Sequence, residues 1–148
     1  MCTVSGTTVT TNAAGLCTLK ATLGGSADWE AAPPVVRSFA VGYGVPALLP
    51  PGDKTFNAGS TVPVKFQLTS ANGQPIAGAL AASLGCTVNV SLNGGSPVCA
   101  DYAPGSAQFH ANINTSKSLT AGATCLLSIT VTVGPNTVTN ATFALVAK

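Results

Sequence analysis

The residues that could do chemistry in this chain are few and scattered along it. They are one histidine, His110, four acids and five cysteines: Asp28, Glu30, Asp53, Asp101, Cys2, Cys17, Cys86, Cys99 and Cys125. No two cysteines have the Cys-x-x-Cys spacing, and one histidine cannot complete the usual zinc ligand sets, so we expect no zinc site. Disulfide bonds in an oxidising compartment fit this pattern better.

His110 and the four acids do not form a recognisable catalytic arrangement. Nucleophilic catalysis needs a base that a third group orients, and glycoside hydrolysis needs two carboxylates facing one cleft. Asp28 and Glu30 flank Trp29 and could contribute to a calcium site, but such a site needs several more oxygen ligands. We therefore predict that the protein is not an enzyme and has no catalytic residue, no metal and no cofactor.

The composition excludes several classes of partner. Of the 148 residues, 46% are hydrophobic and only 7% are charged, and the net charge is +2. So small a charge, with no basic run, argues against binding to nucleic acid or to an anionic membrane. No stretch approaches 18 uninterrupted apolar residues, so we expect no insertion into a membrane. A chain of this length can bury one core, or one core and part of another.

Apolar and polar residues alternate in several segments, which is the pattern of half-buried β-strands. In one segment Val62, Val64, Phe66 and Leu68 share one face, while the other face carries Pro63, Lys65 and Gln67. The same alternation recurs at residues 16–23, 86–92, 109–113 and 127–133, and it places His110 on a polar, solvent-facing side. No segment keeps a helical period. About seven short strands separated by turns predict a sandwich of two antiparallel sheets.

The run Pro63-Val64-Lys65-Phe66 resembles the signature of the PxKF family, an immunoglobulin-like domain of secreted and surface-attached bacterial proteins. The Asn72-Gly73-Gln74-Pro75 turn and Cys125, near the penultimate strand, strengthen the resemblance. It covers about residues 55–148. It implies an all-β fold, namely an immunoglobulin-like antiparallel β-sandwich.

A Pro- and Gly-rich stretch at residues 42–51 divides the chain. Residues 2–6, 14–19 and 31–41 resemble the C-terminal half of a bacterial immunoglobulin-like repeat module, whose relatives carry further strands upstream. We therefore predict two units, a partial module at residues 1–43 and a PxKF-type domain at residues 44–148.

The partial module is too small to bury its own apolar faces, so these faces must be covered by other protein surface. Self-association through residues 1–43 is the favoured cover, and docking within the chain is the alternative.

The resemblance also suggests how the cysteines pair. Related modules carry cysteines at both Cys2 and Cys17, so we expect that disulfide. Cys86 and Cys125 share inward parity, and PxKF relatives place a cysteine at Cys125, so we favour Cys86–Cys125, with Cys86–Cys99 as the rival. One cysteine is left free in either case.

The expected role is that of a non-enzymatic structural or adhesion module, a stiff disulfide-stabilised spacer of a secreted or cell-surface bacterial protein. Met1 is followed by strand-like residues rather than a signal peptide, so we expect it to stand inside a longer protein whose signal peptide and upstream modules are absent here. One alternative is a domain that binds a glycan or a protein, and another is a subunit that self-assembles through an unpaired sheet edge. Trp29 is expected to plug the end of the sandwich, with a binding anchor as the alternative.

Overall fold

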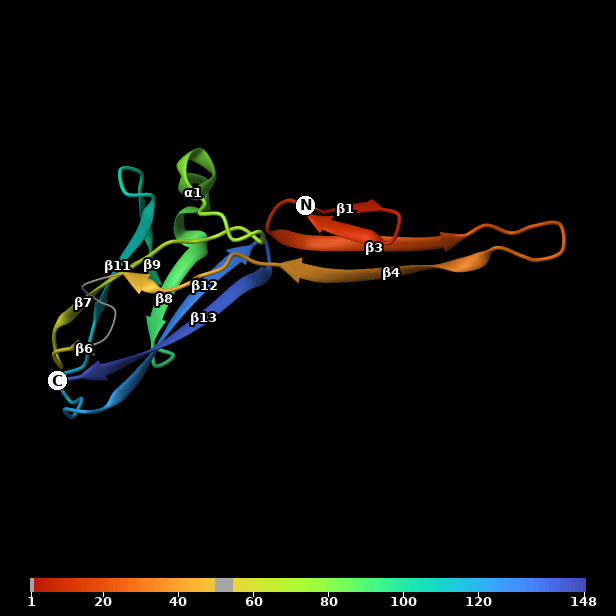
Figure 1. Cartoon of the computed structure of the whole chain (residues 1–148). Helices are drawn as coiled ribbons and strands as arrows, with labels where there is room; N and C mark the ends of the chain where they lie inside the picture. Colours follow the sequence, from red (N-terminus) through yellow and green to blue (C-terminus); the bar gives the residue numbers. More distant parts are fainter. Residues whose placement is uncertain (1, 50–54) are drawn as a thin grey trace.

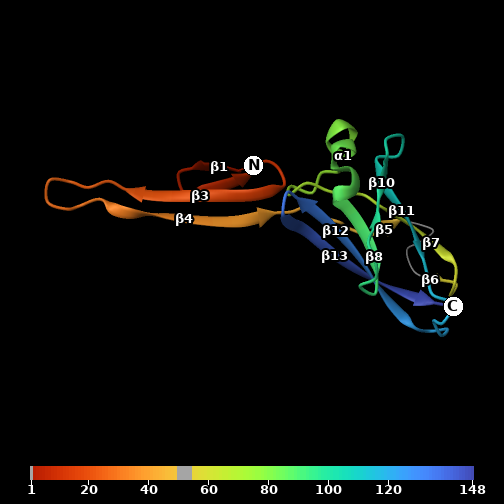
Figure 2. The ribbon, with the colours of Figure 1, turned by 180° about the vertical axis from the view of Figure 1, so that it is seen from behind.

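The computed structural model describes residues 2–49 and 55–148. The fold is all-β, as the alternating segments predicted. A long two-stranded ribbon projects from one end of a two-sheet sandwich, and the C-terminus lies near the opposite end of that sandwich (Figure 1). The view from behind shows the same lengthwise arrangement (Figure 2).

One sheet of the sandwich has four strands in the order β10-β11-β7-β5, all antiparallel. Their bounds are Asp101–Ala103 for β10, Gln108–Asn114 for β11, Thr61–Phe66 for β7 and Leu48–Leu49 for β5. The Pro-x-Lys-Phe run lies on β7, at the centre of this sheet, where β11 and β5 pair with it on either side.

The second sheet has five strands in the order β6-β13-β12-β8-β9. Their bounds are Thr55–Phe56 for β6, Asn136–Ala147 for β13, Thr124–Val133 for β12, Val88–Leu92 for β8 and Val98–Cys99 for β9. Every neighbouring pair is antiparallel except β6 and β13, which run parallel.

The core lies between the two sheets and is built from the apolar faces that the alternation predicted. Phe66 and Phe109 stack at its centre, with ring centroids 5.7 Å apart. Fully buried partners come from the other sheet: Val88, Val90, Leu127, Ile129, Val131 and Leu145. Burial of so many large aliphatic side chains is the main source of stability for this unit.

The ribbon consists of β3, Gly15–Leu23, and β4, Ala32–Val41. Their register sets Cys17 opposite Phe39 and Leu19 opposite Arg37. A smaller hairpin of β1, Cys2–Ser5, and β2, Thr8–Thr11, lies beside the base of the ribbon (Figure 1). Each hairpin is a sheet of only two strands.

No segment of the sequence keeps a helical period, yet the structure contains one short helix. A seven-residue helix, α1, spans Gly78–Leu84 and continues into one 3₁₀ turn, η1, at Gly85–Thr87. Its inner side buries Ala81 and Leu84. It is too short to display a helical period, and Ala77 at its N-terminus provides no capping side chain. No helix of the described residues has the length needed to cross a membrane.

The expected linker is part of the sandwich rather than a separate connection. Leu48 is buried and pairs with Phe66, while Tyr43 and Val45 pack against the core. Residues 50–54, which include Pro50, Pro51 and Asp53 of the sequence-based predictions, lie outside the described residues.

Candidate functional site: the joint between ribbon and sandwich

The chain passes from the ribbon into the sandwich through Gly42, Tyr43 and Gly44, which we call the joint. The backbone of Gly42 lies in close contact with the backbone of β13. A Cβ atom at this position would overlap the carbonyl oxygen of Val138 and come within 3.1 Å of Thr139 Oγ1. The position therefore requires glycine because the backbones approach so closely, not because of its flexibility.

Thr139 holds the next residue of the joint. The Tyr43 backbone N–H donates a hydrogen bond to Thr139 Oγ1 at 2.7 Å, and the same hydroxyl donates to the Tyr43 carbonyl at 2.8 Å. Thr139 is only 8% exposed and is the one buried polar side chain of the described residues. A buried polar group that is fully satisfied in this way fixes a single local geometry.

Gly44 completes the joint on the other side. It exchanges two backbone hydrogen bonds with Thr69, both at 2.8 Å, and a Cβ on Gly44 would overlap the Thr69 hydroxyl. The half-buried Tyr43 ring packs against the core, and this burial raises the pKa of its phenol. The joint is thus bonded to both β13 and the segment that follows β7.

Cys2 and Cys17 form a disulfide, with their Cα atoms 5.8 Å apart. The bond attaches the β1–β2 hairpin to the base of the ribbon, and Cys17 becomes almost fully buried. This is the pairing that the module resemblance implied.

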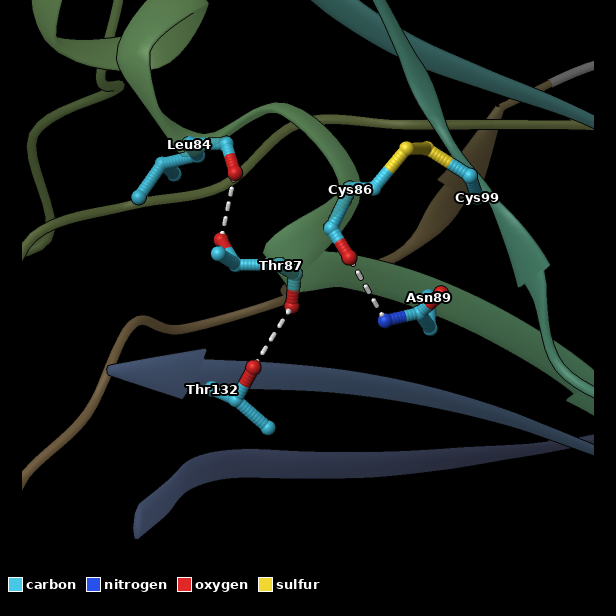
Figure 3. The surroundings of a disulfide bond; sticks show 6 residues. All are labelled: Leu84, Cys86, Thr87, Asn89, Cys99 and Thr132. Carbon is cyan, nitrogen blue, oxygen red and sulfur yellow. Dashed lines mark hydrogen bonds between the residues drawn. A yellow bond between two sulfur atoms is a disulfide. The ribbon is translucent and has the colours of Figure 1, made fainter. Parts of the chain in front are cut away.

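The favoured pairing of Cys86 with Cys125 is wrong. Cys86 is bonded to Cys99, with a Cα–Cα distance of 4.9 Å, and Cys125 is a buried free thiol. The error came from placing Cys86 on an inward strand face. Cys86 instead lies in η1, before β8 begins, and that turn carries it across to the end of β9 (Figure 3).

The surroundings of this disulfide explain why Cys125 is out of reach. The turn is held by hydrogen bonds from Thr87 Oγ1 to the Leu84 carbonyl and from Asn89 Nδ2 to the Cys86 carbonyl (Figure 3). Thr132, at the far end of β12, donates to the Thr87 carbonyl. Cys125 lies near the start of β12, whereas residue 131, next to Thr132, lies near its end. These two positions are about 20 Å apart along an extended strand, so Cys125 lies toward the other end of the sheet, away from the turn.

Trp29 does not plug the sandwich. It lies in the loop at the tip of the ribbon and is 79% exposed. Its carbonyl accepts a hydrogen bond from the Ser26 N–H within that loop. The structure leaves the indole ring in solvent, where Asp28 and Glu30 are its neighbours in sequence.

His110 lies on the outer face of its sheet, as its parity predicted, but it is partly buried there rather than fully exposed to solvent. It is paired across the sheet with Asp101 on one side and Lys65 on the other. Its Nε2 atom is enclosed and has no hydrogen-bond partner among the described residues. No three His, Cys, Asp or Glu side chains within residues 2–49 and 55–148 gather in a way that could hold a metal ion.

Sequence reasoning missed the joint, although one signal was available. Thr139 has the same parity as Phe143 and Leu145 on the last strand, so a polar residue stood on an inward face there. Gly42 gave no such signal, because a glycine beside prolines indicates a linker as readily as a close contact.

Comparison of the chain with protein-family models, with curated proteins and with solved structures finds no match.

Proposed function

We propose that this chain is a non-enzymatic structural and adhesion module of a secreted or cell-surface bacterial protein, and that its immunoglobulin-like sandwich and ribbon act together as a stiff spacer. The observation that carries the proposal is the joint. The contact of Gly42 with β13, the paired hydrogen bonds of Thr139 and the bridge between Gly44 and Thr69 resist bending at the point where two units meet.

Two further features support a spacer outside the cell. Each unit has its own disulfide, Cys2–Cys17 in the N-terminal unit and Cys86–Cys99 in the sandwich. Such bonds persist in oxidising compartments. The ribbon and the sandwich lie end to end, so that the molecule is long in one direction (Figure 1).

The stiffness of the joint can be tested by replacing Gly42 with Val. We expect the native ribbon and sandwich to tumble as one body in ¹⁵N relaxation measurements. In Gly42→Val, the side chain collides with the Val138 backbone, and the ribbon amides should then report faster, independent motion. Thr139→Val should act in the same direction and cost about 1–3 kcal/mol, because the Tyr43 N–H and carbonyl lose their partner.

Gly24→Val is the matched control, since nothing lies within 4 Å of a Cβ at Gly24. It should leave the relaxation of both units unchanged. Independent tumbling of the ribbon in the native protein would contradict the spacer proposal. A Gly42→Val variant with native sandwich signals, in which the ribbon still tumbles together with the sandwich, would also contradict the spacer proposal.

A second function, self-assembly through the ribbon, is favoured by the apolar surface that the ribbon exposes. Several of its large hydrophobic side chains are 41–72% exposed: Leu16, Leu23, Val35, Val36 and Phe39. No strand of the described residues pairs with the outer edges of β3 and β4. Unpaired edges recruit strands from other chains, and an isolated two-stranded ribbon is only marginally stable in water.

We expect the full chain to sediment as a dimer or larger species, and Val36→Lys to shift it toward monomer. A charge on the ribbon opposes both edge pairing and burial of its apolar face. Leu126→Lys is the control, because Leu126 is 49% exposed, like Val36 at 50%, but lies on the sandwich. A native chain that is monomeric at high concentration contradicts self-assembly and leaves the spacer proposal untouched.

A further inference from the structure

A cleft of about 450 Å³ lies beside the joint, between the N-terminal unit and one end of the sandwich. One wall comes from the end of β2 and the turn that follows it, residues 10–14. The other wall comes from residues 70–76 and from Leu80 of α1, and Gly42 and Tyr43 of the joint lie between the walls. The volume falls within the range of small-molecule sites, about 300–1,000 Å³.

The lining of the cleft carries no charge and combines polar side chains with a larger apolar surface. Six of its residues have hydroxyl or carboxamide side chains: Thr10, Thr11, Asn12, Ser70, Asn72 and Gln74. The remaining surface is apolar and includes Ile76 and Leu80, and Tyr43 adds an aromatic ring with a polar tip. Neither a lysine, an arginine nor a carboxylate lines it.

The wall formed by residues 70–76 is a rigid turn. Ser70 N–H donates to the Gln74 carbonyl at 2.8 Å, Gly73 N–H donates to the Ser70 carbonyl at 2.9 Å, and Gly73 takes the positive φ of 80° that this turn requires. Ile76 N–H donates to the Leu68 carbonyl at 2.9 Å and ties the turn to the sandwich. A wall fixed in this way loses little entropy when a ligand binds.

Several polar groups of the cleft remain available for a ligand. The Ser70 hydroxyl is used within the turn, where its one proton is shared between two acceptors, Asn72 Oδ1 and the Gln74 carbonyl oxygen. The Gln74 carboxamide and the Asn72 Nδ2 group, by contrast, make no hydrogen bond to any described residue, and both side chains are exposed. These groups supply donors and an acceptor along one wall.

We propose that this cleft binds a neutral saccharide. An anionic ligand would find no cation in the lining, and a metal ion would find no carboxylate. A purely apolar ligand would leave the carboxamides and hydroxyls buried without partners, which is costly. A pyranose ring matches what remains, because its hydroxyls need uncharged donors and acceptors and its C–H faces need apolar or aromatic contact. A saccharide bound here contacts both the N-terminal unit and the sandwich.

The experiment titrates the ¹⁵N-labelled full chain with glucose, galactose, mannose, N-acetylglucosamine, maltose, lactose and N,N′-diacetylchitobiose to high millimolar concentrations. Glucuronic acid, glucose 6-phosphate and an uncharged Ser/Thr-rich peptide are titrated in parallel. We expect at least one neutral sugar to shift the amide signals of Thr11, Asn72 and Gln74 in a saturable way. Gln74→Ala and Ala71→Trp, which respectively remove a polar group and fill the cleft, should each weaken that binding about tenfold.

Asn112→Ala is the control, because it removes an exposed carboxamide from β11, away from the cleft, and should leave the affinity unchanged. The proposal is overturned if no neutral sugar gives saturable shifts at the cleft. It is also overturned if the charged sugars or the peptide bind more tightly than every neutral sugar, or if Asn112→Ala weakens binding as much as Gln74→Ala.

Discussion

Replacing Leu127 by Ala is expected to lower the free energy of unfolding by about 2–5 kcal/mol, whereas the same change at the adjacent Leu126 should cost less than about 0.5 kcal/mol. Leu127 is fully buried, and β12 sets it opposite Leu92 on one side and Phe143 on the other. Leu126 points to the other face of the strand and is 49% exposed. The large effect combines lost apolar burial with the cavity left in a packed core.

Urea denaturation of the two variants measures this difference directly. Both substitutions remove the same atoms from neighbouring positions of one strand, so strand propensity and sequence context are matched. Equal losses at the two positions would mean that both faces of β12 are buried, whereas a shift of the strand by one residue would exchange its two faces and move the loss to Leu126. A loss confined to Leu126 would place the core on the opposite side of this sheet.

The longer strands of the sandwich could be predicted because each has one buried and one exposed face. The alternation at residues 61–68, 109–113 and 127–133 depends on that asymmetry, and the structure buries the apolar members in each case. His110 and Lys65 were assigned to the outer face for the same reason. Side-chain parity therefore predicts burial where a long strand packs one face on a core, but not in the ribbon, where Leu19 in the alternating segment 16–23 is only partly buried and Leu23 is 72% exposed.

The short edge strands could not be predicted, because they are too brief to show any period. β5, β6 and β9 have two residues each and β10 has three. Their pairing is decided by long-range contacts, such as that of Leu48 with Phe66, and not by local sequence. α1 was missed for a similar reason, since its seven residues form a helix that packing, rather than capping, stabilises.

The joint shows a different limit of sequence reasoning. Gly42, Tyr43 and Gly44 precede a proline and were assigned to a linker, as their composition suggests. What makes them a fixed connection is the approach of β13, almost a hundred residues further along the chain, where Thr139 bonds Tyr43 at a sequence separation of 96. The amino-acid composition of a segment indicates how freely the segment can move in isolation. Its packing contacts in the folded protein decide whether it moves there.

The pairing of the sandwich cysteines leads to the second large effect. Removing the disulfide with Cys86→Ala/Cys99→Ala should lower the free energy of unfolding by about 3 kcal/mol, because the cysteines close a loop with a sequence separation of 13 and the unfolded chain gains that freedom when the bond is lost. Cys125→Ala keeps the bond and removes only one buried sulfur atom, so we expect a smaller loss, mainly from the cavity.

Reduction separates these two cases. Dithiothreitol should destabilise Cys125→Ala by as much as it destabilises the native protein, since both contain the same two disulfides. In Cys86→Ala/Cys99→Ala it should act only through Cys2–Cys17. The reverse result, in which reduction has little effect on Cys125→Ala, would mean that Cys125 takes part in the bond. Cys86 would then have to lie on the inward face of β8, and η1 could not be the turn that carries it to β9.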